Sequence, residues 1–169
     1  MNILIPILQF VITLILGVLI LWVYFKYLKN KFNKYNPVEP VNTAISVFIA
    51  SNLFAITYIM SAMFVSIKDM MAILNSNLGD SNFTFKCTGF LIVFLVTSLI
   101  IGVLSNYIAE VLFDKLTSDV DELNEIAKGN IEYSILMGVI IICIAILVNP
   151  ALSSILQAMI PYPDVVRFN

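Results

Sequence analysis

The sequence predicts an all-α integral membrane protein with four transmembrane helices, and three observations point to this fold class. Of the 169 residues, 60% are hydrophobic and 12% are charged, whereas soluble domains have roughly 45–50% apolar and about 25% charged residues. Four uncharged stretches are long enough to cross a bilayer, which takes about 20 apolar residues. Small and polar residues also recur at matching places in the two halves of the chain.

The expected spans are residues 4–27, 41–65, 88–109 and 131–149. We end the fourth span before Pro150 because proline lacks a backbone donor and clashes with the preceding turn. Residues 151–160 are then a helical extension or an interfacial segment, and residues 67–74 a short separate interfacial helix. Together these elements form one membrane domain, residues 1–160, followed by a C-terminal tail, residues 161–169.

The distribution of basic residues predicts the orientation of these spans. The connectors after the first and third spans carry six basic residues, and the opposite side carries three. Because Lys and Arg accumulate in cytoplasmic loops, both connectors are expected in the cytoplasm and both termini outside it.

An internal repeat relates the two halves. TLILGVL at residues 13–19 returns as SLIIGVL at residues 98–104, and Asn-xxx-Ser-xxx-small begins both the second and the fourth span. We expect two tandem helical hairpins with the same orientation, over about residues 4–65 and 88–150. The helix-start residues of this pattern are Asn42 and Asn130.

Small residues spaced by four lie on one helix face, where they let two backbones approach closely in lipid. They therefore predict helix-packing seams, and the alternative is that these faces line a pore. The seam residues are Gly17, Ser46, Ala50, Gly102, Ser134 and Gly138.

The run Ile126-Ala127-Lys128-Gly129-Asn130, leading into an apolar span that contains Ser134, resembles a motif of the YjfL-like family. This is a family of small bacterial membrane proteins built from a doubled two-span unit (domain of unknown function 350). The resemblance covers about residues 4–150. The first copy departs from the motif because no Gly precedes Asn42, and residues 131–133 are larger than is usual. The resemblance implies a multi-pass protein of the bacterial inner (plasma) membrane and implies no activity.

The connector after the third span is rich in acidic residues and predicts a short amphipathic helix. Ser118 is its expected N-cap, Gly129 the left-handed residue that ends it, and Asn130 the cap of the fourth span. The helix is either a solvated connector or a docking surface for a cytoplasmic protein partner. The docking residues would be Asp119, Asp121, Glu122 and Glu125.

A polar stripe follows the third span at helical spacing. An Asn or Ser in lipid seeks a partner across a helix interface, so the stripe predicts contacts between helices or subunits, and a water-filled path is the alternative. The stripe residues are Ser98, Ser105 and Asn106.

Composition excludes several kinds of function. The chain has no His and a net charge of −2, and its two cysteines, Cys87 and Cys143, belong to no metal-ligand cluster. We therefore expect no enzyme activity, no cofactor, no metal and no nucleic-acid partner. Beyond the lipid bilayer, the expected partner is a second copy of the chain.

A membrane enzyme or transporter is disfavoured, because the chain has no His and no charge in the middle of a span, and two functional hypotheses remain. The first is an oligomeric channel or membrane effector in a stress or defence response. The alternative is a non-conducting membrane scaffold or anchor that holds a cytoplasmic protein through its connectors.

Overall fold

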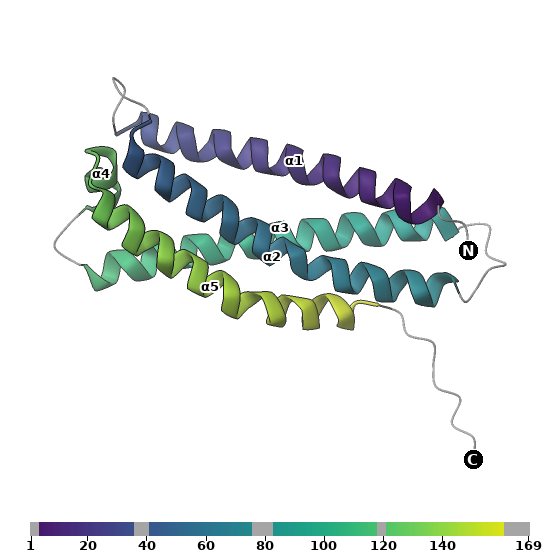
Figure 1. The fold of residues 1–169 in the computed structure, drawn as a ribbon. Coiled ribbons are helices and arrows are strands. Elements are labelled where there is room, and N and C mark those ends of the chain that lie inside the picture. The colour runs from purple at the N-terminus through teal and green to yellow at the C-terminus, as the bar shows by residue number, and fades with distance from the viewer. Residues whose placement is uncertain (1–3, 36–40, 76–82, 118–120, 161–169) are drawn as a thin grey trace, which may run out of the picture. The chain divides into compact units, whose positions relative to one another are not determined.

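A computed structural model of the chain describes residues 4–35, 41–75, 83–117 and 121–160 (Figure 1). Four of its helices are long and apolar enough to cross a membrane, so the predicted all-helical membrane class is confirmed. A fifth, short helix lies in the connector after the third long one. The helices are α1 (Leu4–Asn33), α2 (Thr43–Asn75), α3 (Phe83–Leu116), α4 (Glu122–Ala127) and α5 (Ile131–Ala158).

Helices α1, α2 and α3 each extend beyond the spans expected from the uncharged stretches. The separate interfacial helix predicted at 67–74 is wrong, because α2 runs without a break to Asn75. Ile67 and Met70 explain why α2 continues. Both side chains are buried, and this burial stabilises the helix in the register of its preceding turns. The predicted C-terminal tail, residues 161–169, lies outside the described residues.

Helix α5 also continues past the point where Pro150 was expected to end the span. The proline withholds one N–H, the donor that the Ile146 carbonyl would otherwise receive. Polar side chains add bonds around this position. Ser154 Oγ donates to the Pro150 carbonyl at 3.1 Å, and Asn149 Nδ2 donates to the Tyr58 carbonyl at 2.6 Å. The helical extension of residues 151–160 is thus confirmed as far as Ala158.

The chain divides into two compact units, and each takes helices from both predicted repeats. Unit 1 comprises Met1–Leu53 and Phe113–Val139. The rings of Phe32 and Phe48 pack edge to face with their centroids 5.3 Å apart, which joins α1 to α2. The fully buried core side chains of this unit include Leu28, Phe32, Ile45, Phe48, Phe113 and Ile126.

Unit 2 comprises Phe54–Leu112 and Ile140–Asn169. Its core is built from α2, α3 and α5, with side chains at helical spacing on each. Its fully buried residues include Ile56, Ile59, Met63, Met70, Phe94 and Ile141.

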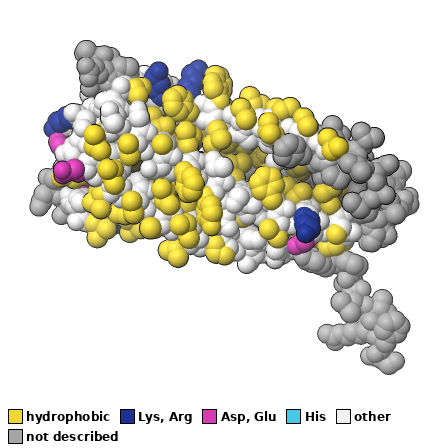
Figure 2. All heavy atoms as spheres, in the orientation of Figure 1, with side chains coloured by type: hydrophobic (Ala, Val, Ile, Leu, Met, Phe, Trp, Pro, Cys, Tyr) yellow, Lys and Arg dark blue, Asp and Glu magenta, His cyan; other side chains and the backbone are white. Residues whose placement is uncertain are grey.

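The outward faces of the long helices are apolar. Trp22, Val18, Ile100 and Leu147 are each 58% or more exposed, and hydrophobic side chains cover much of the face drawn in Figure 2. In a water-soluble protein, burying such side chains would lower the free energy of the folded state, whereas in a bilayer the lipid tails surround them. The exposed surface therefore fits a bilayer.

Candidate functional site

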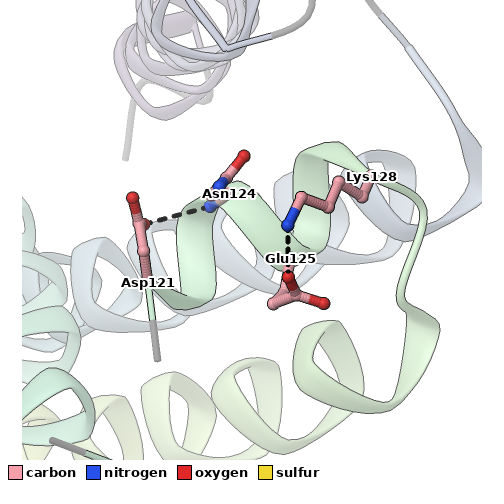
Figure 3. Close-up of polar contacts among 4 residues, drawn as sticks. All are labelled: Asp121, Asn124, Glu125 and Lys128. Carbon is pink, nitrogen blue, oxygen red and sulfur yellow. Dashed lines mark hydrogen bonds and ion pairs between the residues drawn. The ribbon is translucent and has the colours of Figure 1, made fainter. Parts of the chain in front are cut away.

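Helix α4 begins at Glu122, and Asp121 is its N-cap rather than the predicted Ser118. The Asp121 carboxylate accepts a hydrogen bond from the Asn124 backbone N–H at 3.1 Å (Figure 3). Asp caps a helix as well as Ser does, and the sequence offered both. Ser118 itself lies outside the described residues, as does Asp119, one of the predicted docking residues.

The end of α4 confirms the predicted turn into the membrane helix. Gly129 has φ +96°, a left-handed conformation that favours glycine. Its backbone N–H donates to the Ile126 carbonyl at 3.0 Å, which closes the helix end. Asn130 Oδ1 then accepts from the Glu132 backbone N–H at 3.2 Å, so Asn130 caps α5 as expected.

Asn42 does more than the sequence predicted. Its Oδ1 accepts from the Ile45 N–H at 2.8 Å, which caps α2. Its Nδ2 also donates to the carbonyls of Ala127 at 2.9 Å and Ile126 at 3.3 Å. The Asn42 side chain thus supplies a hydrogen-bond acceptor to a backbone N–H at the start of α2 and donors to two backbone carbonyls at the end of α4. The sequence signal was the amide itself, which keeps two donors after its oxygen has capped a helix.

The predicted docking acids differ in exposure. Asp121 is exposed and Glu125 is half-buried, and the Lys128 ammonium donates to Glu125 Oε1 at 2.7 Å (Figure 3). That hydrogen bond holds the pKa of Glu125 below its ordinary value. Glu122 is only 3% exposed, so the expectation that it belongs to an exposed docking surface is wrong. Its side chain instead lies among the residues that α4 buries, with Ile126 and Ala127.

Burial raises the pKa of the Glu122 carboxyl, because desolvation disfavours the charged form. Its own backbone N–H opposes this by bonding the charged form. The neighbouring carboxylates of Asp114 and Asp121 raise the pKa further by like-charge repulsion. Glu122 is therefore a buried carboxyl group beside two other acidic residues, at a place where the sequence predicted solvent-exposed charges.

The seam residues of the second predicted repeat lie at close helix contacts. Ser134 Oγ donates to the Ala44 carbonyl at 2.5 Å, joining α5 to α2. A Cβ built on Gly138 would lie 2.9 Å from Ser51 Cβ, so only glycine fits there without a shift. A Cβ on Gly102 would meet Ile56 Cγ1 at 3.2 Å, a tight contact with a movable side-chain atom.

The seam residues of the first predicted repeat are more open. Ser46 and Ala50 are exposed, and a Cβ on Gly17 would meet no heavy atom within 4 Å among the described residues. Ser46 Oγ donates to the Asn42 carbonyl of its own helix at 2.9 Å. Gly17 thus makes no close contact of the kind seen at Gly138 among the described residues, and Ser46 and Ala50 are exposed. A seam at these three positions stays a prediction about a second molecule.

The polar stripe of α3 is buried. Ser98, Ser105 and Asn106 are 0%, 6% and 2% exposed. Ser105 Oγ donates to the Ile101 carbonyl of its own helix at 2.7 Å. Ser98 Oγ, and Ser66 Oγ on α2, are buried with no hydrogen-bond partner among the residues that the structure describes.

The family model for Domain of Unknown Function (DUF350) matches residues 2–152. The chain belongs to the DUF350 family. This confirms the resemblance to domain of unknown function 350 that the sequence indicated. No curated protein and no solved structure shows significant similarity to the chain. Membership of the DUF350 family therefore assigns no activity to the chain.

Proposed function

We propose that this DUF350 protein is a small oligomeric membrane protein that conducts ions or small polar solutes and has no enzymatic activity. A stress or defence response remains the proposed setting. The observation that supports conduction is the pair of buried hydroxyls in unit 2, Ser66 on α2 and Ser98 on α3.

A serine inside a helix can satisfy its hydroxyl by donating to the carbonyl four residues earlier. Ser51, Ser105 and Ser154 do so here. Among the described residues, Ser66 and Ser98 make no such bond, although both are 0% exposed. A buried hydroxyl with no partner costs roughly 1–3 kcal/mol, and water is the partner that removes this cost.

Ser98 lies close to the middle of the candidate span Phe85–Leu116. Water at that depth is what a conducting path requires. Because the α3 stripe is buried, we place the path among the helices of unit 2 instead of between subunits. Oligomerisation would use faces that the single chain leaves open, such as those of Gly17 and Ala50.

The experiment is ion flux into liposomes that hold the purified protein, with the oligomeric mass measured in the same detergent. We expect flux above that of empty liposomes and a reduced rate for Ser66→Ala and Ser98→Ala, because each removes a ligand for water. Ser154→Ala is the matched control, since this serine is exposed and bonds its own helix.

A folded, defined oligomer with no flux would overturn the conduction proposal. Flux that is equal in the wild type and in the two variants would keep the channel and remove these serines from its path.

The tandem hairpin arrangement is part of this proposal. Asn42 and Asn130 are 88 residues apart (130 − 42) and both cap a long helix, which supports two copies of one unit. We place the connectors in the cytoplasm and both termini outside, in an inner membrane. Labelling of single cysteines with a membrane-impermeant maleimide tests this. Labelling of residue 34 in intact cells would contradict the orientation.

A membrane scaffold is the second candidate, and the fixed position of α4 favours it. Asn42 ties the end of α4 to the start of α2, and Asp121 remains exposed beside it. Reversing the charges of Asp121 and Glu125 tests the docking of a cytoplasmic protein without disturbing the apolar helices. Recovery of the same partners by the reversed variant would count against docking at α4.

A further inference from the structure

The Glu122 carboxyl is buried in a connector whose other acids face water. The side chain is 3% exposed, and its Oε1 has no hydrogen-bond partner among the residues described. An ionised carboxylate in such a place is costly, because a buried charge needs a counter-charge or a donor. Its own backbone N–H supplies one donor to the charged form, so the charged groups around Glu122 tell whether it also has a counter-charge.

Those charged groups are both negative. Asp114, near the end of α3, lies within hydrogen-bonding contact of the Glu122 side chain, and Asp121 precedes it in the chain. No Lys or Arg of the described segments is among the charges that act on it. From the start of α2, the neutral amide of Asn42 also bonds the end of α4.

Two ionised carboxylates offer acceptors only, so they repel each other at hydrogen-bonding distance. One added proton changes this, because a carboxylic acid donates a short, charge-assisted bond to a carboxylate. Asp114 is exposed, which gives the proton a route from water to the pair.

We propose that Asp114 and Glu122 form a proton-binding site in which one shared proton fastens the start of α4 to the end of α3. The proton comes from water and forms one O–H bond on Glu122, which donates to the Asp114 carboxylate. The charge of the pair changes from −2 to −1, and no other bond forms or breaks.

A proton fits this site better than a metal ion. Ca²⁺ takes about 6–8 oxygen ligands, and no group of three or more His, Cys, Asp or Glu that could hold a metal occurs among the described residues. A shared proton needs only the two carboxyl groups that the structure brings together.

The direction of the pH effect follows from proton linkage. Because the native pKa of Glu122 is raised, the folded connector binds more protons than the unfolded one between the two pKa values. Its stability is complete below the unfolded pKa, falls as the pH rises, and has lost the full contribution above the native pKa. One proton can increase the opening of α4 by at most about tenfold per pH unit.

The test is hydrogen–deuterium exchange of α4 in lipid nanodiscs over a pH series, corrected for the intrinsic exchange rate. We expect faster opening of the wild-type helix as the pH rises through the native pKa. E122Q should lose this dependence, since its amide can donate to Asp114 at every pH. D114N should move the dependence to lower pH, because it replaces the repelling charge with a donor.

E132Q is the matched control, because Glu132 is an exposed acid in the first turn of α5, and it should behave like the wild type. Infrared difference spectra follow the proton directly. The wild type should keep a protonated carboxyl band at a pH where exposed acids are ionised, and E122Q should lack it. If E122Q fails to fold, the shift of the pH dependence in D114N still tests the proposal.

Three results would overturn the proposal: pH-independent exchange in the wild type, an unchanged retained band in E122Q, or loss of that band when Mg²⁺ is added at constant pH. The last would assign the pair to a cation instead of a proton. The inference concerns the connector and is measured without ion flux, so it stands or falls separately from conduction.

Discussion

Gly138→Ala adds a methyl group where α5 passes close to α2, and we expect it to destabilise the folded chain. The new Cβ would lie 2.9 Å from Ser51 Cβ and nearer still to the Ser51 hydroxyl oxygen. Carbon atoms in contact prefer about 3.5–4.0 Å, so the helices would have to separate by about 0.6 Å (3.5 − 2.9 Å) or more. Ser51 Cβ cannot rotate away because it is bonded to the α2 backbone.

Overpacking of this kind costs about 1–3 kcal/mol, and replacing a helical glycine returns roughly 0.5–1 kcal/mol. The net loss is therefore about 0–2.5 kcal/mol, and the loss relative to a glycine replaced in open space is about 1–3 kcal/mol. The assay is reversible unfolding in a titration of SDS into mild detergent, followed by circular dichroism. Gly17→Ala is the matched control, because nothing lies within 4 Å of its Cβ position, and it should be neutral or slightly stabilising.

A double-mutant cycle with Ser51→Gly isolates the contact, since the second change removes the atom that the new methyl group meets. We expect a favourable coupling energy of at least about 0.5 kcal/mol in the double variant. If Gly138→Ala were as stable as Gly17→Ala, the close approach of α2 and α5 would be refuted.

Three further predictions concern the polar contacts. Asn42→Ala should lower the free energy of unfolding by about 1–3 kcal/mol, because it removes a helix cap and two bonds to α4. Hydrogen–deuterium exchange at α4 should also become faster. Asn33→Ala, at an exposed position, should change neither quantity. Asn149→Ala should cost about 1–2 kcal/mol in the SDS titration, since it removes a bond to a carbonyl and one to a hydroxyl, and a midpoint equal to wild type would contradict this. The lowered pKa of Glu125 means that its contact with Lys128 is present above the unfolded pKa and is lost as the pH falls through the native pKa; carboxyl NMR should show this low pKa return to normal in Lys128→Gln.

The sequence predicted the elements whose signals are local. Four long apolar stretches became four long helices, Gly129 took the left-handed conformation, and Asn42 and Asn130 capped the helices that they precede. These features depend on hydropathy, on the missing Cβ of glycine and on a side chain that reaches its own backbone. None of them requires knowledge of a neighbouring helix.

What the sequence could not predict depends on tertiary contacts. Helical periodicity placed Glu122 on a charged connector, but only the end of α3 decides that Asp114 lies beside it and that Glu122 is buried. The second bond of Asn42 likewise joins residues 84 and 85 positions apart. The repeat predicted equal roles for Gly17 and Gly102, yet Gly102 meets Ile56 and Gly17 meets nothing within 4 Å.

The lengths of the four long helices have a consequence for the choice of membrane. Helices α1, α2, α3 and α5 have 30, 33, 34 and 28 residues. At about 1.5 Å per residue they measure roughly 42–51 Å, against a hydrocarbon layer of about 30 Å. Tilting or local thickening of the bilayer accommodates such a mismatch at an energetic cost that depends on lipid chain length. The stability of this chain is therefore expected to depend on bilayer thickness, and thicker bilayers should relieve the mismatch of all four long helices.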